Sequence, residues 1–164
     1  MALEELELLE EQEDTQHGRY LTFAVGEEVF GIEIRYVTEI IGIQPITQLP
    51  EAPEHIKGVI NLRGRIVPVV DVRLKFKKPP MEYNDRTCVI VVEANDLVAG
   101  LIVDQVAEVL AIADADVVPP PEYSATVHNS YIRGIGKADG NVKLLLDCEK
   151  LFRADEEAVL RSAV

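Results

Sequence analysis

Two segments of this chain repeat each other, and this repeat constrains the fold more than any other feature. Residues 55–76 read HIKGVINLRGRIVPVVDVRLKF, and residues 132–152 read IRGIGKADGNVKLLLDCEKLF. A shift of 76 positions aligns the two segments without a gap. The identical pairs, two of which are glycines, are Ile56/Ile132, Gly58/Gly134, Gly64/Gly140, Asp71/Asp147 and Phe76/Phe152.

A second alignment, at a shift of 69 positions, lays residues 20–41 over residues 89–110. Gly31/Gly100, Val37/Val106 and Glu39/Glu108 are among the matching pairs. Two copies are too few for a solenoid, which needs three or more units. The repeats therefore predict a pseudo-symmetric pair of small barrels. The alternative is that short Val/Gly motifs recur by chance in any β protein.

The repeated unit itself predicts a β-hairpin. The two apolar runs of its first copy are rich in Val and Ile, whose branched side chains suit a pleated surface. Gly64 lies between the two runs, where a tight turn needs positive φ. We therefore expect positive φ at Gly64 and at its counterpart Gly140. A short helical exit is expected after each hairpin, at residues 72–76 and 147–152.

The rest of the chain predicts an all-β fold with about ten strands and little helix. The Pro-rich segment 77–86 is interpreted as a linker between a first copy at residues 19–76 and a second copy at residues 87–152. Residues 1–18 hold seven acidic and no basic residues, which predicts a flexible acidic tail. Residues 153–164 predict a short C-terminal helix.

Charge and cysteine content exclude several classes of function. The 164 residues carry a formal net charge of −13, which argues against nucleic-acid binding, because that binding depends on Lys and Arg at phosphates. Cys88 and Cys148 do not form a metal-site spacing, and the acidic start has no apolar signal region. The apolar run at residues 97–103 is far shorter than the roughly 20 residues of a membrane helix. We expect a cytoplasmic protein without direct membrane insertion.

Asp71 and Asp147 are the strongest candidates for catalysis. Aspartic proteases build their shared-proton dyad from one Asp in each of two repeats. In those enzymes Thr or Ser and then Gly follow the Asp, whereas Val-Arg and Cys-Glu follow here. An Asp at a strand-to-helix junction is more often an N-cap, and we expect that role for both. The three histidines, which have no ligand spacing, are His17, His55 and His128. We expect no catalytic residue, no metal site and no cofactor, and we interpret the chain as a binding module.

Basic residues are concentrated between positions 57 and 78 of this acidic chain. Seven of its 16 Lys and Arg residues lie there, against the single acid Asp71. They are Lys57, Arg63, Arg65, Arg73, Lys75, Lys77 and Lys78. Two interpretations stay open. These charges are either solvated on the outer faces of strands, or they form a patch for a partner's carboxylate, for which the planar fork of Arg is best suited.

Three stretches together resemble the CheW family of bacterial chemotaxis coupling proteins. They are FGIEIRYVTEI, HIKGVINLRGRIVPVVDVRLKF and VAGLIVDQVAEVL. The resemblance covers about residues 19–152, and the NLRG–IVPVVD block is highly specific to the family. It implies two five-stranded barrel subdomains related by the internal duplication, with the chain crossing between barrels. It also implies a non-enzymatic adaptor that joins the cytoplasmic tips of methyl-accepting chemoreceptors to the histidine kinase CheA.

The resemblance implies two binding surfaces. The receptor-contacting positions of the family match Val37, Glu39 and Arg63, and we expect Val103 and Val106 to line the same groove between the subdomains. The kinase contact is implied at the far end of one barrel, at Ile41, Gly42, Ile43 and the neighbourhood of Gly58. Because the regulatory domain of CheA shares the fold, the resemblance also implies rings built from CheW–CheW or CheW–CheA contacts, recruited to membrane receptor arrays.

Two other functions stay open at this point. A CheW-like scaffold for a different receptor–kinase pathway, such as one for motility on surfaces, has the same sequence features. An aspartic-type hydrolase that uses Asp71 and Asp147 is the remaining alternative. If the protein is an adaptor, Asp71→Asn leaves its function intact.

Overall fold

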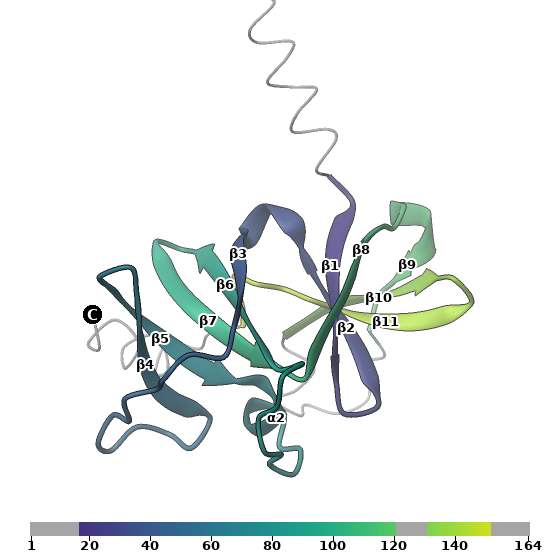
Figure 1. The fold of residues 1–164 in the computed structure, drawn as a ribbon. Coiled ribbons are helices and arrows are strands. Elements are labelled where there is room, and N and C mark those ends of the chain that lie inside the picture. Colours follow the sequence, from purple (N-terminus) through teal and green to yellow (C-terminus); the bar gives the residue numbers. More distant parts are fainter. Residues whose placement is uncertain (1–16, 121–130, 152–164) are drawn as a thin grey trace, which may run out of the picture.

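The computed structural model describes residues 17–120 and 131–151, which form two β-sheets and three short helical segments (Figure 1). Most of the acidic tail expected over residues 1–18 and the C-terminal helix expected over residues 153–164 lie outside the described residues. The described part of the chain is mostly strand, so the predicted all-β class is confirmed.

Six strands form one sheet and five form the other. The six-stranded sheet has the order β8 (Gln105–Ala111), β1 (Arg19–Val25), β2 (Glu28–Glu33), β11 (Asn141–Leu146), β10 (Ile132–Ala138) and β9 (Val117–Val118). The five-stranded sheet has the order β3 (Val37–Gly42), β6 (Cys88–Ala94), β7 (Leu97–Val103), β5 (Arg65–Asp71) and β4 (Ile56–Leu62). The short helices are η1 (Ile34–Tyr36), α2 (Val72–Lys75) and η2 (Asp114–Asp116). Each sheet with the side chains it encloses is one subdomain.

The two sequence copies exchange strands. β1 and β2 lie 69 positions before β6 and β7, and β4 and β5 lie 76 positions before β10 and β11. In the five-stranded sheet β5 pairs in parallel with β7, and Val69 lies opposite Gly100. In the six-stranded sheet β11 pairs in parallel with β2, and Leu145 lies opposite Gly31, which is the same register. Each sheet therefore combines the first hairpin of one copy with later strands of the other, and the chain crosses between sheets at η1 and between β7 and β8.

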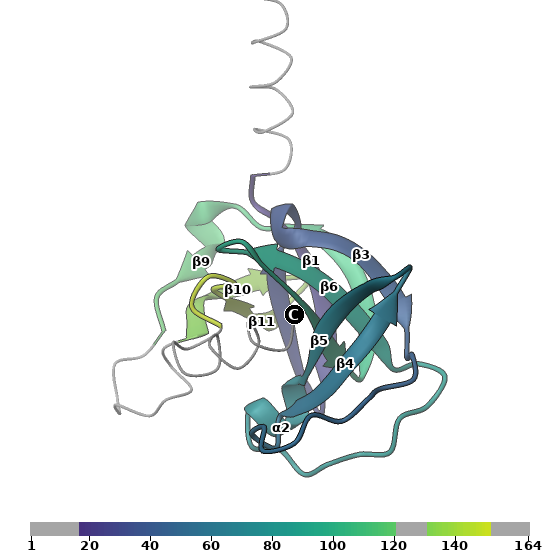
Figure 2. The same ribbon diagram turned by 90° about the vertical axis from the view of Figure 1, so that its left-hand side faces the viewer.

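Each sheet curls towards closure. β3 and β4 lie at opposite edges of the five-stranded sheet, yet the segment after β3 runs back to β4 (Figure 2). There Thr47 and Val59 form an isolated antiparallel bridge with two backbone hydrogen bonds of 2.9 Å. In the six-stranded sheet the chain also runs from one edge to the other after an edge strand. There β9 follows the edge strand β8 and pairs with β10. The two residues of β9 bring this sheet to six strands where five were predicted.

The β4–β5 and β10–β11 hairpins have the same turn. Gly64 and Gly140 have φ values of 85° and 75°, and the preceding Arg63 and Asp139 each have a φ of 53°. Two consecutive positive φ values define a type I′ turn, whose twist matches that of the flanking strands. The predicted positive φ at both glycines is confirmed.

Asp71 and Asp147 cap the segments that follow these hairpins. The Leu74 N–H donates to the Asp71 carboxylate at 3.3 Å, at the start of α2. The Asp147 carboxylate accepts from the N–H groups of Glu149 and Lys150, at 3.0 and 3.2 Å. The predicted helix cap at Asp71 is confirmed, and Asp147 makes equivalent hydrogen bonds to the start of a turn. The helical exit expected after the second hairpin is corrected, because residues 148–150 form a turn.

The main hydrophobic cluster lies between the two sheets. It contains Phe23 of β1 together with Ile90 and Val92 of β6, all fully buried. The alternate β6 residues, Val89 and Val91, face a second cluster inside the five-stranded sheet. β6 is therefore buried on both faces, which explains its continuous apolar sequence. Burial of each such side chain contributes about 1.5–3 kcal/mol before the entropy cost of folding.

Candidate binding surface

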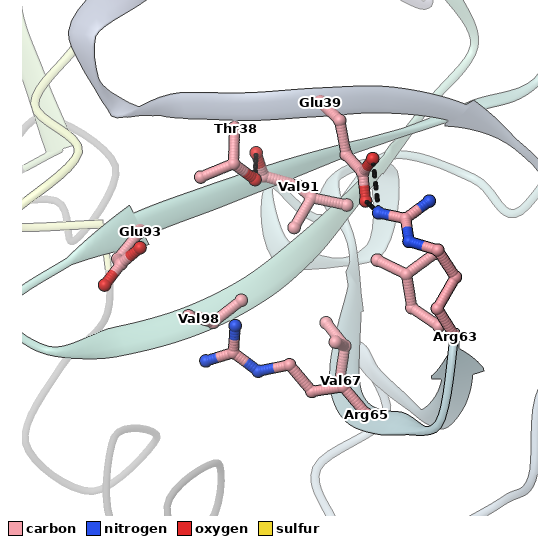
Figure 3. Close-up of a pocket in the computed structure, with 9 residues that line it drawn as sticks. Thr38, Glu39, Arg63, Arg65, Val67, Val91, Glu93 and Val98 are labelled. Atoms are coloured by element: carbon pink, nitrogen blue, oxygen red, sulfur yellow. Dashed lines mark hydrogen bonds and ion pairs between the residues drawn. The ribbon is translucent and has the colours of Figure 1, made fainter.

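Glu39 and Arg63 form an ion pair at one end of the curled five-stranded sheet (Figure 3). Nη2 of Arg63 donates to both carboxylate oxygens of Glu39, at 2.5 and 2.7 Å. Glu39 comes from β3 and Arg63 from the β4–β5 turn, which belong to opposite edges of the sheet. The pair therefore bridges the two edges, and its hydrogen bond raises the pKa of Arg63 above the usual value.

The β4–β5 turn presents Arg63 to solvent. Arg63 occupies the first position of the type I′ turn, and Oδ1 of Asn61 accepts the Gly64 N–H at 2.8 Å. The side chain of Arg63 is 72% exposed and that of Glu39 is 27% exposed. Because water screens such a pair, Arg63 can exchange its carboxylate partner at little cost to folding.

An open groove of about 390 Å³ lies beside this ion pair. Val67 and Val91 supply buried apolar side chains, and Val98 is half-buried among them. Besides Arg63, the exposed charged residues of the lining are Arg65 and Glu93 (Figure 3). Within residues 17–120 and 131–151, neither of these two has an ion-pair partner. The groove can thus receive an apolar side chain together with groups of either charge.

Outside the groove, β3 carries one exposed apolar side chain and half-buried ones. Ile40 is 43% exposed, and Val37 packs half-buried against the main cluster. β8 repeats this arrangement, because Val106 packs against the same cluster and Val109 is 49% exposed. We call Val37 with Ile40 the β3 strip, and Val106 with Val109 the β8 strip. Either strip gives a partner an apolar contact area. Each lies next to a point where the chain crosses between the sheets, which we call the joint.

Val103 lies in the core and not on this surface. It is 1% exposed at the end of β7 and belongs to the main cluster. The expectation that Val103 lines a groove between the subdomains is therefore corrected. The run LVAGLIV of β7 lacks the apolar–polar alternation that would have identified its outward residues.

The four residues predicted to contact a kinase lie at and just beyond the end of β3, and in β4. Ile41 and Ile43 are half-buried against the second cluster, whereas Gly42 is exposed with open space around it. Gly58 is buried at a φ of 146°, and a Cβ there would lie 2.0 Å from the carbonyl oxygen of Thr47. Gly58 therefore serves the close approach of the Thr47 bridge, and a partner can use only its surroundings.

Three of the seven basic residues between positions 57 and 78 pair with acids from elsewhere in the chain. The pairs are Arg63 with Glu39, Arg73 with Asp104, and Lys78 with Glu28. Lys75 is buried, and its ammonium lies 4.6 Å from the ring centroid of Tyr131. The concentrated positive charge is thus partly neutralised within the fold.

Comparison with known proteins agrees with this geometry. Residues 19–156 match the CheW-like domain family. The chain belongs to this family. The chemotaxis protein CheW of Klebsiella aerogenes is 37% identical, over 90% of this chain and 89% of its own. CheW of Rhizobium meliloti is 35% identical, over 87% and 92%. Among solved structures, the scaffolding protein TtCheW from Thermoanaerobacter tengcongensis has a TM-score of 0.78 at 34% identity, covering 85% of this chain and 94% of that one.

The Glu39–Arg63 pair of this CheW-like chain has no counterpart at the equivalent positions of the six-stranded sheet. The repeat shifts place Glu108 and Asp139 in the six-stranded sheet at the positions of Glu39 and Arg63. Both residues are exposed acids, and two like charges cannot form an ion pair. The pseudo-symmetry of the fold therefore does not extend to the candidate surface.

Asp71 and Asp147 are engaged separately in this CheW-like fold. Besides capping α2, the Asp71 carboxylate accepts the Tyr83 hydroxyl at 2.7 Å. Burial, and then this hydrogen bond, raise the pKa of Tyr83. Asp71 ends a strand of one sheet and Asp147 follows a strand of the other, so the two have different partners and do not form a shared-proton dyad.

Residues 17–120 and 131–151 contain no group of three His, Cys, Asp or Glu side chains placed to hold a metal ion. In the same part of the chain, every helix is too short or too polar to cross a membrane.

Sequence reasoning did not single out Ile40 or Glu93, and it named Arg65 only as one of the seven basic residues between positions 57 and 78. Alternation along β3 could have found Ile40, because Thr38, Ile40 and Gly42 share its outward face. Arg65 stands in the same turn as Arg63, but its position at the groove depends on the curl of the sheet. Glu93 reaches the groove from β6 in the other copy of the repeat, so no local pattern identifies it.

Proposed function

We propose that this protein is a non-enzymatic chemotaxis scaffold that couples chemoreceptor tips to the histidine kinase CheA. The observation that carries the proposal is the exposed Glu39–Arg63 pair, set between an open groove and an apolar strip in a CheW-like domain. The names of two relatives, both chemotaxis proteins CheW, and of a structural neighbour, a scaffolding protein, support the same function.

The receptor tip binds at the groove and the β3 strip. Its apolar side chains lose water against Ile40 and Val37, which supplies a non-directional attraction. A carboxylate of the tip accepts hydrogen bonds from Arg63, because the contact of Arg63 with Glu39 uses only Nη2. A planar guanidinium with its remaining N–H groups available can bind a carboxylate through two hydrogen bonds. Apolar contact thus gives affinity, and Arg63 selects a tip that carries an acid.

A single receptor tip binds to each chain. The six-stranded sheet has the β8 strip, but its two acids, Glu108 and Asp139, replace the ion pair. A carboxylate on the tip is attracted by Arg63 and repelled by these acids. The charge difference between the sheets therefore decides which subdomain the receptor uses.

The kinase binds at the other end of β3, around Ile41, Gly42 and Ile43 and the backbone near Gly58. A strand of this length spans roughly 17–20 Å, so the two ends of β3 can hold two partners at once. The regulatory domain of CheA has the same fold by resemblance, and contacts of this kind also join CheW to CheA or to further CheW copies in rings. In this function the protein acts in the cytoplasm at membrane receptor arrays.

Ile40→Asp tests the receptor surface, and Val142→Asp is its matched control. Ile40 is 43% exposed on β3, and Val142 is 57% exposed on β11 of the other sheet. In titrations with a chemoreceptor signalling fragment, Ile40→Asp is expected to weaken binding at least about tenfold, as at an interface hot spot. Val142→Asp is expected to bind like the parent, and both variants to keep the melting temperature. Equal binding by parent and Ile40→Asp would place the receptor elsewhere.

The same titration separates chemotaxis from a second receptor pathway such as one for surface motility. Signalling fragments from each receptor pathway of the organism are compared on the parent chain. The proposal expects chemotaxis receptors to bind most tightly, and preference for another pathway's receptor would reassign the scaffold.

A further inference from the structure

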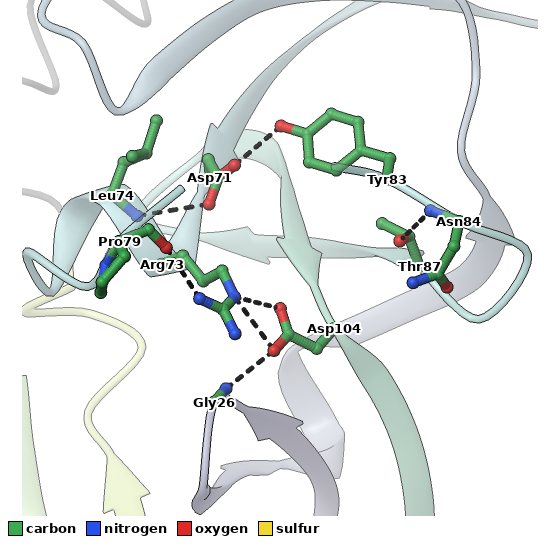
Figure 4. A network of polar contacts seen from close by, with 9 residues as sticks. All are labelled: Gly26, Asp71, Arg73, Leu74, Pro79, Tyr83, Asn84, Thr87 and Asp104. Atoms are coloured by element: carbon green, nitrogen blue, oxygen red, sulfur yellow. Dashed lines mark hydrogen bonds and ion pairs between the residues drawn. The ribbon is translucent and has the colours of Figure 1, made fainter. Parts of the chain in front are cut away.

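The crossing between β7 and β8 is held by a cluster around Asp104 (Figure 4). The Asp104 carboxylate accepts from Nε of Arg73 at 2.8 and 3.1 Å, and from the backbone N–H of Gly26 at 2.7 Å. Arg73 belongs to α2, and Gly26 lies in the β1–β2 turn of the other sheet. Nη1 of Arg73 also donates to the Pro79 carbonyl at 2.7 Å. We call Arg73, Asp104 and Gly26 the first clamp, because they join segments from both sheets.

A second clamp stands at the equivalent positions with its charges exchanged. The repeat shifts relate Arg73 to Glu149, Asp104 to Arg35, and Gly26 to Asn95. Nη2 of Arg35 donates to the Tyr36 hydroxyl at 2.8 Å, and this hydroxyl donates to Oε1 of Glu149 at 3.1 Å. Nδ2 of Asn95 donates to the Glu149 carbonyl at 3.3 Å. In the first clamp the residue at the crossing between the sheets is the acid Asp104. In the second clamp it is the base Arg35.

The first clamp is the drier and more direct of the two. The side chains of Arg73 and Asp104 are 16% and 17% exposed, whereas that of Arg35 is 60% exposed and Glu149 is exposed. Acid and base touch in the first clamp, but a Tyr36 hydroxyl separates them in the second. Water screens exposed charges strongly, and a well hydrogen-bonded pair with little water keeps its geometry. The crossing between β7 and β8 is therefore more rigid than the crossing at η1.

Each clamp lies two residues before one of the apolar strips. Asp104 precedes Val106 of the β8 strip, and Arg35 precedes Val37 of the β3 strip. The backbone of Asp104 adds to the first clamp, because its N–H donates to the Ala24 carbonyl at 3.2 Å. The place where β8 begins is thus fixed against β1, next to the strip.

We propose that Arg73 and Asp104 are positioning residues that fix the joint between the two sheets and the place of the β8 strip. The second clamp, being exposed, lets the start of β3 adjust to a partner. The effect on the joint rests on this geometry alone, and the effect on partner binding rests also on the proposed function. Neither residue lines the groove beside Arg63.

Asp104→Asn and Glu149→Gln each remove one charge from one clamp and form a matched pair for the test. Hydrogen–deuterium exchange, thermal melting and titration with a receptor signalling fragment are measured on the full chain. Asp104→Asn is expected to raise exchange at residues 24–26 and 104–107 about tenfold, with β6 unchanged, because these hydrogen bonds open locally. It should lower the melting temperature by about 3–8 °C, whereas receptor binding, which uses the groove and the β3 strip, should stay within about threefold of the parent value. Glu149→Gln should leave exchange at these residues and the melting temperature close to the parent values.

A charge-exchanged variant gives an independent check. Arg73→Asp with Asp104→Arg copies the polarity of the second clamp and should recover part of the melting temperature lost by Asp104→Arg alone. Equal exchange in Asp104→Asn and Glu149→Gln, or no recovery in the double variant, would overturn the proposal. If the parent chain does not bind the receptor fragment, the proposed function fails, and the exchange data still decide the role of the clamp.

Discussion

Within the residues that the structure describes, Arg63 pairs with Glu39, and in the proposed function it has a second partner on the receptor. Its guanidinium extends from a turn that Asn61 and Gly64 stabilise independently. The ion pair with Glu39 is exposed, so folding depends on it weakly. This separation of roles makes Arg63 the residue at which binding and stability can be told apart.

Arg63→Ala is expected to leave the melting temperature within about 1–2 °C of the parent. Binding of a receptor fragment should weaken at least about tenfold through the lost charge-assisted contact, while binding of CheA, at the other end of β3, stays the same. Arg86→Ala, at an exposed arginine of the linker, is the control and should change neither. Thermal melts and separate titrations check this. Parallel loss of both partners, or of stability with binding, would show that Arg63 holds the sheet edges together.

Three glycines of the five-stranded sheet are expected to rank by backbone geometry in their tolerance of alanine. Gly42 has open space and no positive φ, so Gly42→Ala should be nearly neutral. Gly64 also has open space, but its φ of 85° predicts a loss of about 1–2 kcal/mol. Gly58→Ala should lose most, because its Cβ would lie 2.0 Å from a backbone oxygen. Urea unfolding measures the order, and a Gly64→Ala variant as stable as Gly42→Ala would refute the turn argument.

The two cysteines are expected to differ in reactivity. Burial raises the pKa of the Cys148 thiol to about 12, so almost no thiolate forms at pH 8. Cys88 is partly exposed at the start of β6. A thiol reagent at pH 8 should therefore modify Cys88 in the native protein and Cys148 only after unfolding. Rapid modification of a folded Cys88→Ser variant would contradict the buried position of Cys148.

At the scale of elements, the sequence predicts what depends on neighbouring residues. The type I′ turns at Gly64 and Gly140 and the caps at Asp71 and Asp147 follow from local patterns. The sequence does not predict β9, because two residues show no periodicity. They are a strand only because they pair with β10. The exit after Asp147 was predicted as a helix from its likeness to α2, but it forms a turn.

The acidic tail provides a prediction at this scale. Removal of residues 1–17 is expected to leave the melting temperature within about 1–2 °C of the parent, because an acidic segment repels itself and buries little apolar area. His17 lies 3.6 Å from Asp114 and would be lost, but both side chains are largely exposed. Thermal melts of the full and the shortened chain measure this difference. A drop of several degrees would show that Leu3, Leu6 and Leu9 dock on the domain.

At the scale of the whole molecule, the exchange of strands between the two copies decides where the site residues meet. The repeat predicts two subdomains, but parallel pairing of β5 with β7 joins residues of different copies, and only the family resemblance indicated this crossing. The contact between Arg63 and Glu39 likewise depends on the curl of the sheet, since the two lie 24 positions apart. Val103 was misplaced for the same reason, because an apolar run buried on both faces does not show which residues reach the surface.

The most direct test of the coupling function is co-sedimentation of CheA with receptor-bearing vesicles, with and without this chain. CheA is expected to sediment when the chain is present, Arg63→Ala is expected to abolish most of this recruitment, and Arg86→Ala is expected to preserve it. Sedimentation of CheA that does not depend on the chain, or equal recruitment by Arg63→Ala and the parent, would contradict the account.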